Sequence, residues 1–237
     1  MKDSDQERVN EMNKIDDPLA RSLQAKEILK RLRTDIILGE YKSGSRLIES
    51  KVADQLGCSR APIRTAFQLL SQEGLVLNLS NGGTEVIGFT SKQAHDLFEL
   101  RLLLEQKALE QILANRSFHF RPLFESMEQL EQRLSIPGNA PSSAETSVLD
   151  IQFHRSLVMM SENSPLLVAW NTMANVFQAI LEITNMTSPT YQQFYESHRR
   201  LADLVIQRNP DSISELRHHI ANANEIIIAR LEKNMKT

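Results

Sequence analysis

The chain has 237 residues, of which 41% are hydrophobic, 24% are charged and only 5% are aromatic. This composition is that of an ordinary globular protein with room for one or two cores, and the low aromatic, glycine and proline content favours helices over an all-β fold. The single cysteine excludes an internal disulfide and fits the reducing cytoplasm. No apolar stretch approaches the ~18 residues of a membrane span, so no membrane partner is expected.

The net charge of −3 is unevenly distributed along the chain. Residues 1–18 carry −3, residues 19–84 carry +4, and the remainder carries −4. A basic segment attached to an acidic body is typical of a small DNA-binding unit joined to a domain with another task. We therefore expect a mobile arm over 1–18, followed by a DNA-binding domain.

Apolar residues at helical spacing predict a first helix over 19–38. After a turn-rich linker, a short helix over 48–56 ends at Gly57, which tolerates the left-handed conformation. A further helix follows over 59–74. Helix, short glycine turn and helix in this order predict a helix-turn-helix motif.

The helix over 59–74 has Ser59 as its expected N-cap and two distinct faces. Its apolar face consists of Ile63, Phe67 and Leu70. Its opposite face consists of Arg60, Ala61, Arg64, Thr65 and Gln68. Two arginines four residues apart suit a helix that enters the DNA major groove, although an ordinary surface helix would carry the same residues.

Two short strands are predicted after this helix, over 75–77 and 85–87. The segment 78–84 between them is a hairpin tip that contains Gly82 and Gly83. A hairpin directly after a helix-turn-helix is a wing, whose glycines let the backbone approach phosphate or the minor groove. The alternative is an unrelated surface hairpin.

The order of these motifs carries a resemblance to a known family. The residues concerned are Arg33, Gly39, Gly44-Ser45-Arg46-Leu47, Ser59-Arg60-Ala61-Pro62-Ile63-Arg64 and Glu73-Gly74-Leu75-Val76. Over residues 19–88 this order resembles the winged-helix head of the GntR family of bacterial transcription regulators. The resemblance implies DNA contacts by Arg33, Ser59, Arg60, Arg64, Thr65, Gly82 and Gly83. Ala61 and Thr65 depart from the residues usual in the family, so the resemblance does not carry over a base preference at these two positions.

From residue 89 onward the pattern is helical throughout, and no strand is predicted. The six expected helices cover about 91–114, 121–134, 144–161, 165–185, 189–208 and 211–234. In the first of them, Ser91 is the expected cap, and the expected inward stripe is Leu97, Leu100, Leu104 and Ala108. The fold class is therefore mainly α, with a winged helix-turn-helix domain over 19–88 and an all-α six-helix bundle over 89–237.

Four residues of this bundle form a candidate metal site. Asp150 and His154 are four residues apart, so both side chains leave one helix face, while His198 and His219 lie on two later helices. Three imidazoles and a carboxylate suit Zn²⁺, Ni²⁺ or a similar divalent ion if the three helices face each other. The alternative is that these are ordinary polar-face or core histidines.

A second resemblance concerns the order Glu99-Leu100-Arg101, Leu104-Glu105, Asp150, Phe153-His154, Leu157, Asn163, His198 and Leu216-Arg217-His218-His219-Ile220. It is similar to the FCD effector domain of the FadR branch of GntR regulators. The resemblance implies that Asp150, His154, His198 and His219 hold a metal and that Arg101 faces the same cavity. His218 is the alternative to His219, and a surface ion pair with Glu105 is the alternative for Arg101.

These features lead to one main hypothesis and two alternatives. We expect a cytoplasmic, dimeric transcription regulator, either a repressor or an activator, that binds a palindromic DNA operator and responds to a small organic acid bound at the metal. Phosphate-loop, dinucleotide and nucleophile-elbow motifs are missing, so an enzyme is not expected. The alternatives are a metal-dependent hydrolase in the helical domain and a pure metal sensor. A redox role for Cys58 has no support in the sequence.

Overall fold

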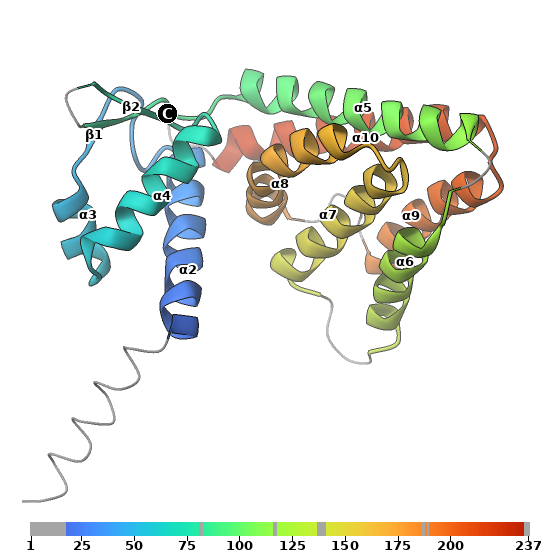
Figure 1. Cartoon of the computed structure of the whole chain (residues 1–237), viewed down its shortest axis with the longest axis horizontal. Coiled ribbons are helices and arrows are strands. Elements are labelled where there is room, and N and C mark those ends of the chain that lie inside the picture. Colours follow the sequence, from blue (N-terminus) through green and yellow to red (C-terminus); the bar gives the residue numbers. More distant parts are fainter. Residues whose placement is uncertain are drawn as a thin grey trace, which may run out of the picture. The chain divides into compact units, whose positions relative to one another are not determined.

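The computed structural model describes residues 18–80, 83–115, 118–136, 141–185, 188 and 190–234. It divides into two compact units between Gly88 and Phe89 (Figure 1). The predicted arm covers residues 1–18, of which 1–17 lie outside the described residues, as does the wing residue Gly82, whereas Pro18 is the first residue of a helix.

The first unit combines three helices with a small sheet. Its elements are α2 (Pro18–Ile37), β1 (Arg46–Leu47), α3 (Glu49–Leu56), α4 (Arg60–Gln72), β2 (Val76–Asn78) and β3 (Thr84–Val86). The sheet is antiparallel with strand order β1-β3-β2, and Val76 pairs with Val86. The predicted helix-turn-helix and wing are confirmed, whereas β1 was not predicted because two residues give no alternation pattern.

The turn between α3 and α4 forms as its residues dictate. Gly57 adopts φ 62° and ψ 36° at the C-cap of α3, which is the left-handed region that glycine enters without steric cost. The helix α4 packs on α2, α3 and β2. Its buried side chains include Ile63, Phe67 and Leu70, and each such burial contributes roughly 1.5–3 kcal/mol. This packing leaves the opposite face of α4 outward.

A buried ion pair fastens α2 to the end of α4. The Nε and Nη2 atoms of Arg33 donate to the two carboxylate oxygens of Glu73, each at 2.7 Å. Their side chains are only 8% and 5% exposed. The guanidinium is therefore enclosed within the first unit, which is at odds with the DNA contact expected for Arg33, and we do not include this residue in the proposed interface.

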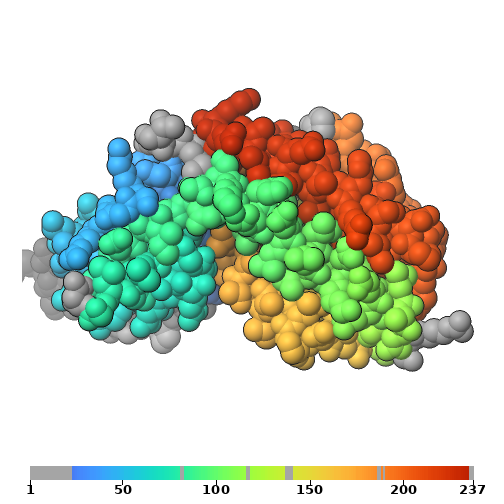
Figure 2. Space-filling model, turned by 90° about the horizontal axis from the view of Figure 1, so that it is seen from above, coloured from blue at the N-terminus to red at the C-terminus, as the bar shows by residue number. Residues whose placement is uncertain are grey.

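The second unit is an all-α bundle of six helices within the described residues. They are α5 (Ser91–Ala114), α6 (Arg121–Leu134), α7 (Ser143–Met160), α8 (Ser164–Thr184), α9 (Tyr191–Ile206) and α10 (Asp211–Asn234). The helices α5 and α10 lie side by side along this unit (Figure 2). The predicted all-α bundle is confirmed.

Two details of α5 differ from the prediction. Its N-cap is Thr90 rather than Ser91, because the Thr90 hydroxyl accepts a hydrogen bond from the backbone of Gln93 at 3.2 Å. Its inward face is also rotated from the expected leucine stripe, and Leu100 is 43% exposed. The fully inward residues are Ala94, Phe98, Arg101, Glu105, Ala108, Leu109 and Ile112.

The helix α8 is long and apolar enough to cross a membrane by length and composition alone. One face of it packs into the bundle, where Trp170, Phe177 and Ile180 are at most 1% exposed, whereas Val168 on another face is 65% exposed. Its apolarity therefore reflects in part burial against the neighbouring helices.

We expect Arg33→Ala to lower the free energy of unfolding of the first unit by about 3–5 kcal/mol, because the buried Glu73 carboxylate then loses both hydrogen bonds from Arg33. Chemical denaturation of the full-length protein measures this change. The control is Arg31→Ala, which breaks an exposed 3.7 Å pair with Asp35 and should cost less than about 1 kcal/mol. If Arg33→Ala left the stability unchanged but weakened DNA binding, the original expectation that Arg33 contacts DNA would be supported instead.

Candidate DNA interface and candidate metal centre

The outward face of α4 presents two arginine side chains to solvent. Arg60 and Arg64 are 63% and 62% exposed. Thr65 and Ala61 lie on the same face, and the Thr65 hydroxyl donates to the Ala61 carbonyl at 3.3 Å. The predicted pair of arginines is thus available to a partner.

A single carboxylate holds both arginines, and sequence reasoning did not single it out. Arg64 donates from Nε and Nη2 to the two oxygens of Glu49, each at 3.0 Å, and Arg60 donates from Nη2 to Oε2 at 2.9 Å. Hydrogen bonds from Arg64 and Arg60 lower the pKa of Glu49 to about 2. Glu49 therefore stays ionised at every physiological pH.

The base of the wing reaches the same area. Glu49, Arg60, Arg64 and Gly83 line a common hollow of about 360 Å³, together with neighbouring residues of β1, α3 and β3. Ser59 is the N-cap of α4, but its side chain makes no capping hydrogen bond. The structure therefore brings the two arginines and one of the two predicted wing glycines together.

Cys58 follows Gly57 in the turn and is half-buried. Burial raises the pKa of its thiol. A raised pKa disfavours the reactive thiolate, so the structure adds no support for a redox role of Cys58.

The four predicted metal ligands come together in the second unit. Asp150 and His154 project from α7, His198 from α9 and His219 from α10, and their ligand atoms all lie within 4.8 Å of one another. The Nε2 atoms of His154 and His219 are 3.2 Å apart, and His198 Nε2 is 3.2 Å from Asp150 Oδ1. His218 is exposed and lies outside the cluster.

These separations fit a divalent metal ion. Ligand atoms at the ~2.0–2.2 Å typical of Zn²⁺ stand about 3–3.5 Å from their neighbours in the coordination shell. Two of the contacts, at 3.2 Å, match that spacing. His154 Nε2 and Asp150 Oδ1 are 3.9 Å apart, and the four ligand atoms span up to 4.8 Å, so they would draw closer together around an ion. The donor set, three imidazole nitrogens and one carboxylate oxygen, is one that Zn²⁺ and Ni²⁺ accept.

Hydrogen bonds on the far side of two rings direct their Nε2 lone pairs into the cluster. His154 Nδ1 lies 2.6 Å from a Glu105 oxygen, and His198 Nδ1 lies 2.7 Å from the Phe194 carbonyl. Both acceptors lack protons, so each Nδ1 carries the proton. The Nε2 lone pair of His198 then faces the Asp150 oxygen, and this contact requires a bridging proton or a cation.

Glu105 and Arg101 form a second layer behind the cluster. Glu105 is fully buried and also accepts from Arg101 Nε at 2.9 Å and from Trp170 Nε1 at 3.0 Å. Arg101 Nη2 donates to Asp150 Oδ2 at 3.2 Å, and its guanidinium lies over the Phe177 ring. The pair with Glu105, expected as a surface alternative, is present but buried, and Arg101 also lines the cavity.

This layer also sets the charge states. Burial alone would raise the pKa of Asp150, but Arg101 and the histidines hold it well below its usual range. Burial lowers the pKa of His154, with a further contribution from Arg101. Burial and the rings of His198 and His154 hold the pKa of His219 well below its usual value. An ionised carboxylate and neutral imidazoles are the forms that bind metal.

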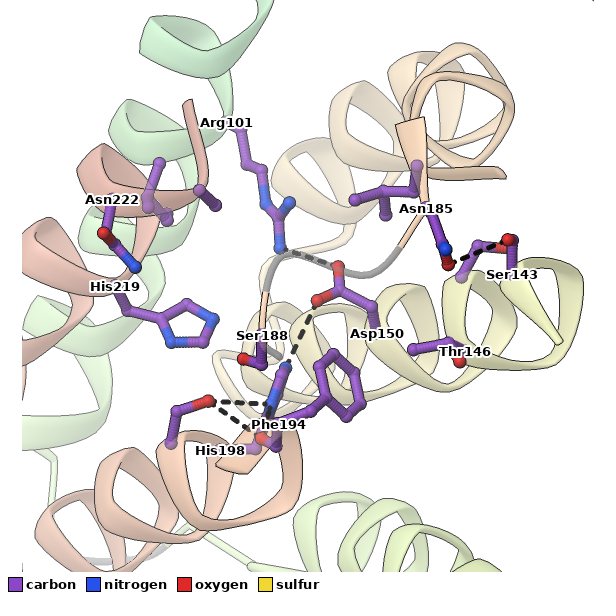
Figure 3. A pocket seen from close by; sticks show the side chains of 15 residues that line it. Arg101, Ser143, Thr146, Asp150, Asn185, Ser188, Phe194, His198, His219 and Asn222 are labelled. Carbon is purple, nitrogen blue, oxygen red and sulfur yellow. Dashed lines mark hydrogen bonds and ion pairs between the residues drawn. The ribbon is translucent and has the colours of Figure 1, made fainter. Parts of the chain in front are cut away.

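A cavity of about 70 Å³ opens beside the cluster (Figure 3). The close-up shows Arg101, Asp150 and His198 joined by hydrogen bonds, with His219 facing them from α10. Seven neutral hydroxyl or amide side chains line the cavity: Ser143, Thr146, Ser147, Asn185, Ser188, Ser197 and Asn222. The arrangement therefore offers both a cation site and a polar chamber.

A winged helix-turn-helix with outward arginines, joined to a helical bundle with its own ligand-type cluster, defines a DNA-binding transcription regulator. Comparisons with known proteins agree. The model of bacterial regulatory proteins of the gntR family matches residues 24–86, and the FCD domain model matches residues 96–222. The chain belongs to the gntR family, in the branch that carries an FCD domain.

Similar proteins include a probable D-xylose utilization operon transcriptional repressor of Paenarthrobacter nicotinovorans, 30% identical over 86% of this chain and 88% of the relative. The gluconate operon transcriptional repressor of Bacillus subtilis is 24% identical over 78% and 74% of the two chains. These relatives are transcription regulators rather than enzymes, which rules against the hydrolase alternative.

Solved structures show the same fold. The Listeria monocytogenes protein Lar has a TM-score of 0.61 with 17% identity, covering 88% of this chain and 96% of that chain. A GntR family member from Pseudomonas syringae has a TM-score of 0.51 with 23% identity, covering 90% and 88%.

We expect the purified protein to carry about one divalent ion per chain, and a His154→Ala/His198→Ala variant to lose it because two imidazole ligands are gone. Elemental analysis measures the content. The emission of Trp170, the single tryptophan, should also change on chelation, because its indole shares Glu105 with His154. His218→Ala is the matched control and should keep the ion. Equal metal content in all three proteins would refute the assignment.

Proposed function

We propose that this regulator is a dimeric repressor that binds a palindromic operator and responds to a small hydroxylated acid held beside a divalent ion. The observation that carries the proposal is the convergence of the Asp150, His154, His198 and His219 donor atoms next to a polar cavity. Repression itself is supported by the names of the relatives.

The ion would be held by the four cluster residues. When bound, it would supply positive charge and, if five- or six-coordinate, one or two open positions for oxygen ligands. Glu105 and the Phe194 carbonyl orient the His154 and His198 rings, and Arg101 orients the Asp150 carboxylate. Such outer partners fix ring orientation and tautomer, so the site is prepared before the ion arrives.

The lining of the cavity favours an effector with several oxygens. Hydroxyl and amide groups can donate to and accept from ligand hydroxyls, whereas a purely aliphatic acid offers them no such groups along its carbon chain. Arg101 adds a positive charge for a carboxylate, although two of its donor nitrogens already serve Glu105 and Asp150. The names of the relatives that govern gluconate and D-xylose operons point to sugars and sugar acids as the first compounds to test, and gluconate is the one that carries a carboxylate.

The effector would act by shifting helices. The proposed ligands come from α7, α9 and α10, and α10 packs along α5. Arg101 and Glu105 tie α5 directly to Asp150 and His154. Since α5 begins at Ser91, just after the first unit ends at Gly88, a shift of α5 would change how the two DNA-binding units of a dimer are spaced.

On DNA, α4 would enter the major groove with Arg60, Arg64 and Thr65 toward the bases. Ser59 and the wing glycines Gly82 and Gly83 would lie against the backbone or minor groove. An arginine fork can meet O6 and N7 of guanine together, which supplies about 1–3 kcal/mol of discrimination.

A pure metal sensor is the second candidate. It is favoured by the same three-helix cluster, because an ion alone would join α7, α9 and α10. Operator affinity that follows metal occupancy without any acid would support this reading over the main proposal.

We expect gluconate to raise the melting temperature of the metal-loaded protein by about 5–10 °C at a hundredfold excess over its dissociation constant. Thermal-shift assays measure this. Hexanoate, of equal carbon number but without hydroxyls, is the control and should have little effect. The shift should vanish in His154→Ala/His198→Ala. Equal stabilisation by both acids, or stabilisation without metal, would contradict the proposal.

Arg64→Ala should weaken binding to the preferred operator by about 10–100-fold, because a bidentate base contact is lost. Non-specific affinity should fall by no more than about threefold, since one phosphate-attracting charge is removed. Binding titrations with both kinds of duplex measure the two effects. The charge-matched control Arg31→Ala should change both affinities equally and slightly, and equal losses in Arg64→Ala would remove its base-reading role.

A further inference from the structure

Glu49 is placed where it can govern both candidate base-reading arginines. It is the first residue of α3, and its carboxylate is 25% exposed between Arg60 and Arg64. Both of its oxygens are used, because Oε1 accepts from Arg64 and Oε2 accepts from Arg64 and Arg60. One carboxylate therefore organises two flexible cationic side chains of the neighbouring helix.

We propose that Glu49 is a positioning residue that sets the operator specificity of this regulator by holding Arg60 and Arg64 in the geometry that reads guanine. The inference rests on the proposed function, in which α4 enters the major groove.

The geometry at Arg64 supports this role. Arg64 turns the edge formed by Nε and Nη2 toward Glu49 in a two-pronged contact. The guanidinium is planar and has a second donor edge, formed by Nη1 and the other Nη2 proton. That edge remains for a base, and it has the two-donor spacing that matches O6 and N7 of guanine.

Holding the arginines before DNA arrives reduces the number of conformers that must be given up on binding. A free arginine on a surface helix samples many rotamers and can contact phosphates in several positions. When Nε and Nη2 of Arg64 are hydrogen-bonded to Glu49, the side chain is restricted to the few rotamers that keep these bonds. Glu49 therefore favours one base contact over many alternative phosphate contacts.

The carboxylate also acts against non-specific binding. Its pKa of about 2 keeps it negative, and a negative charge beside the groove repels phosphates. A residue that only stabilised the fold would change specific and non-specific binding in the same direction. A positioning carboxylate should change them in opposite directions, and this difference makes the proposal testable.

The experiment uses the full-length protein and a library of random-sequence DNA duplexes, so that no operator need be known. Selection followed by sequencing yields the preferred motif and its guanine preference at each position. For Glu49→Gln we expect the guanine preference at the positions read by α4 to fall by about tenfold, within the range of one bidentate contact. Its affinity for a duplex that lacks the motif should rise by about two- to threefold, because one repulsive charge is gone.

Asp54→Asn is the matched control. Asp54 lies on the same helix, is exposed, and makes no hydrogen bond to Arg60 or Arg64 among the described residues. The control removes the same charge, so it should raise non-specific affinity similarly and leave the motif unchanged. Circular dichroism establishes that each variant is folded.

Glu49→Asp provides a second variant that keeps the charge but withdraws the carboxylate by one methylene. Glu49→Asp should lose guanine preference without gaining non-specific affinity. If Glu49→Gln does not fold, this variant alone tests whether Glu49 positions the two arginines. Folded Glu49 variants that select the wild-type motif with equal preference would overturn the inference. Failure of the wild-type protein to select any motif would instead overturn the proposed function.

Discussion

The buried carboxylate of Glu105 is the constraint on which the second unit depends. It accepts hydrogen bonds from Arg101, His154 and Trp170 without any exposure to water. An ionised carboxylate in such a place is costly unless each oxygen is paired, and here both oxygens are. The same bonds fix the His154 tautomer and join α5, α7 and α8. The buried negative charge of Glu105 therefore also orients the His154 ring toward the other three cluster residues.

Carboxylate–arginine contacts recur in the protein, and their burial separates their roles. The pair of Arg33 with Glu73 is enclosed and ties α2 to α4. The contacts of Arg60 and Arg64 with Glu49 are open to solvent. Under the proposed function, similar chemistry therefore serves stability where it is buried and DNA recognition where it is exposed.

Much of this could be predicted from the sequence, because helix periodicity, glycine turns and the Asp150–His154 spacing are local signals. Hydropathy alone did not predict the inward face of α5, because it favoured three leucines, whereas the structure buries Arg101 and Glu105 beside the expected Ala108. The inward placement of Arg101 was expected only from the family resemblance. The enclosure of Arg33 and the role of Glu49 depend on partners 40 and 15 residues away, respectively. Such pairings are set by tertiary packing, and the periodicity of apolar residues along the sequence gives no information about them.

The proposal that Asp150, His154, His198 and His219 hold a divalent ion can be tested by X-ray absorption spectroscopy of the metal-loaded protein. We expect a first shell of three imidazole nitrogens and at least one oxygen at about 2.0–2.2 Å, with one imidazole lost in His198→Ala and none lost in His218→Ala. A shell without imidazole, or an unchanged spectrum in His198→Ala, would contradict it.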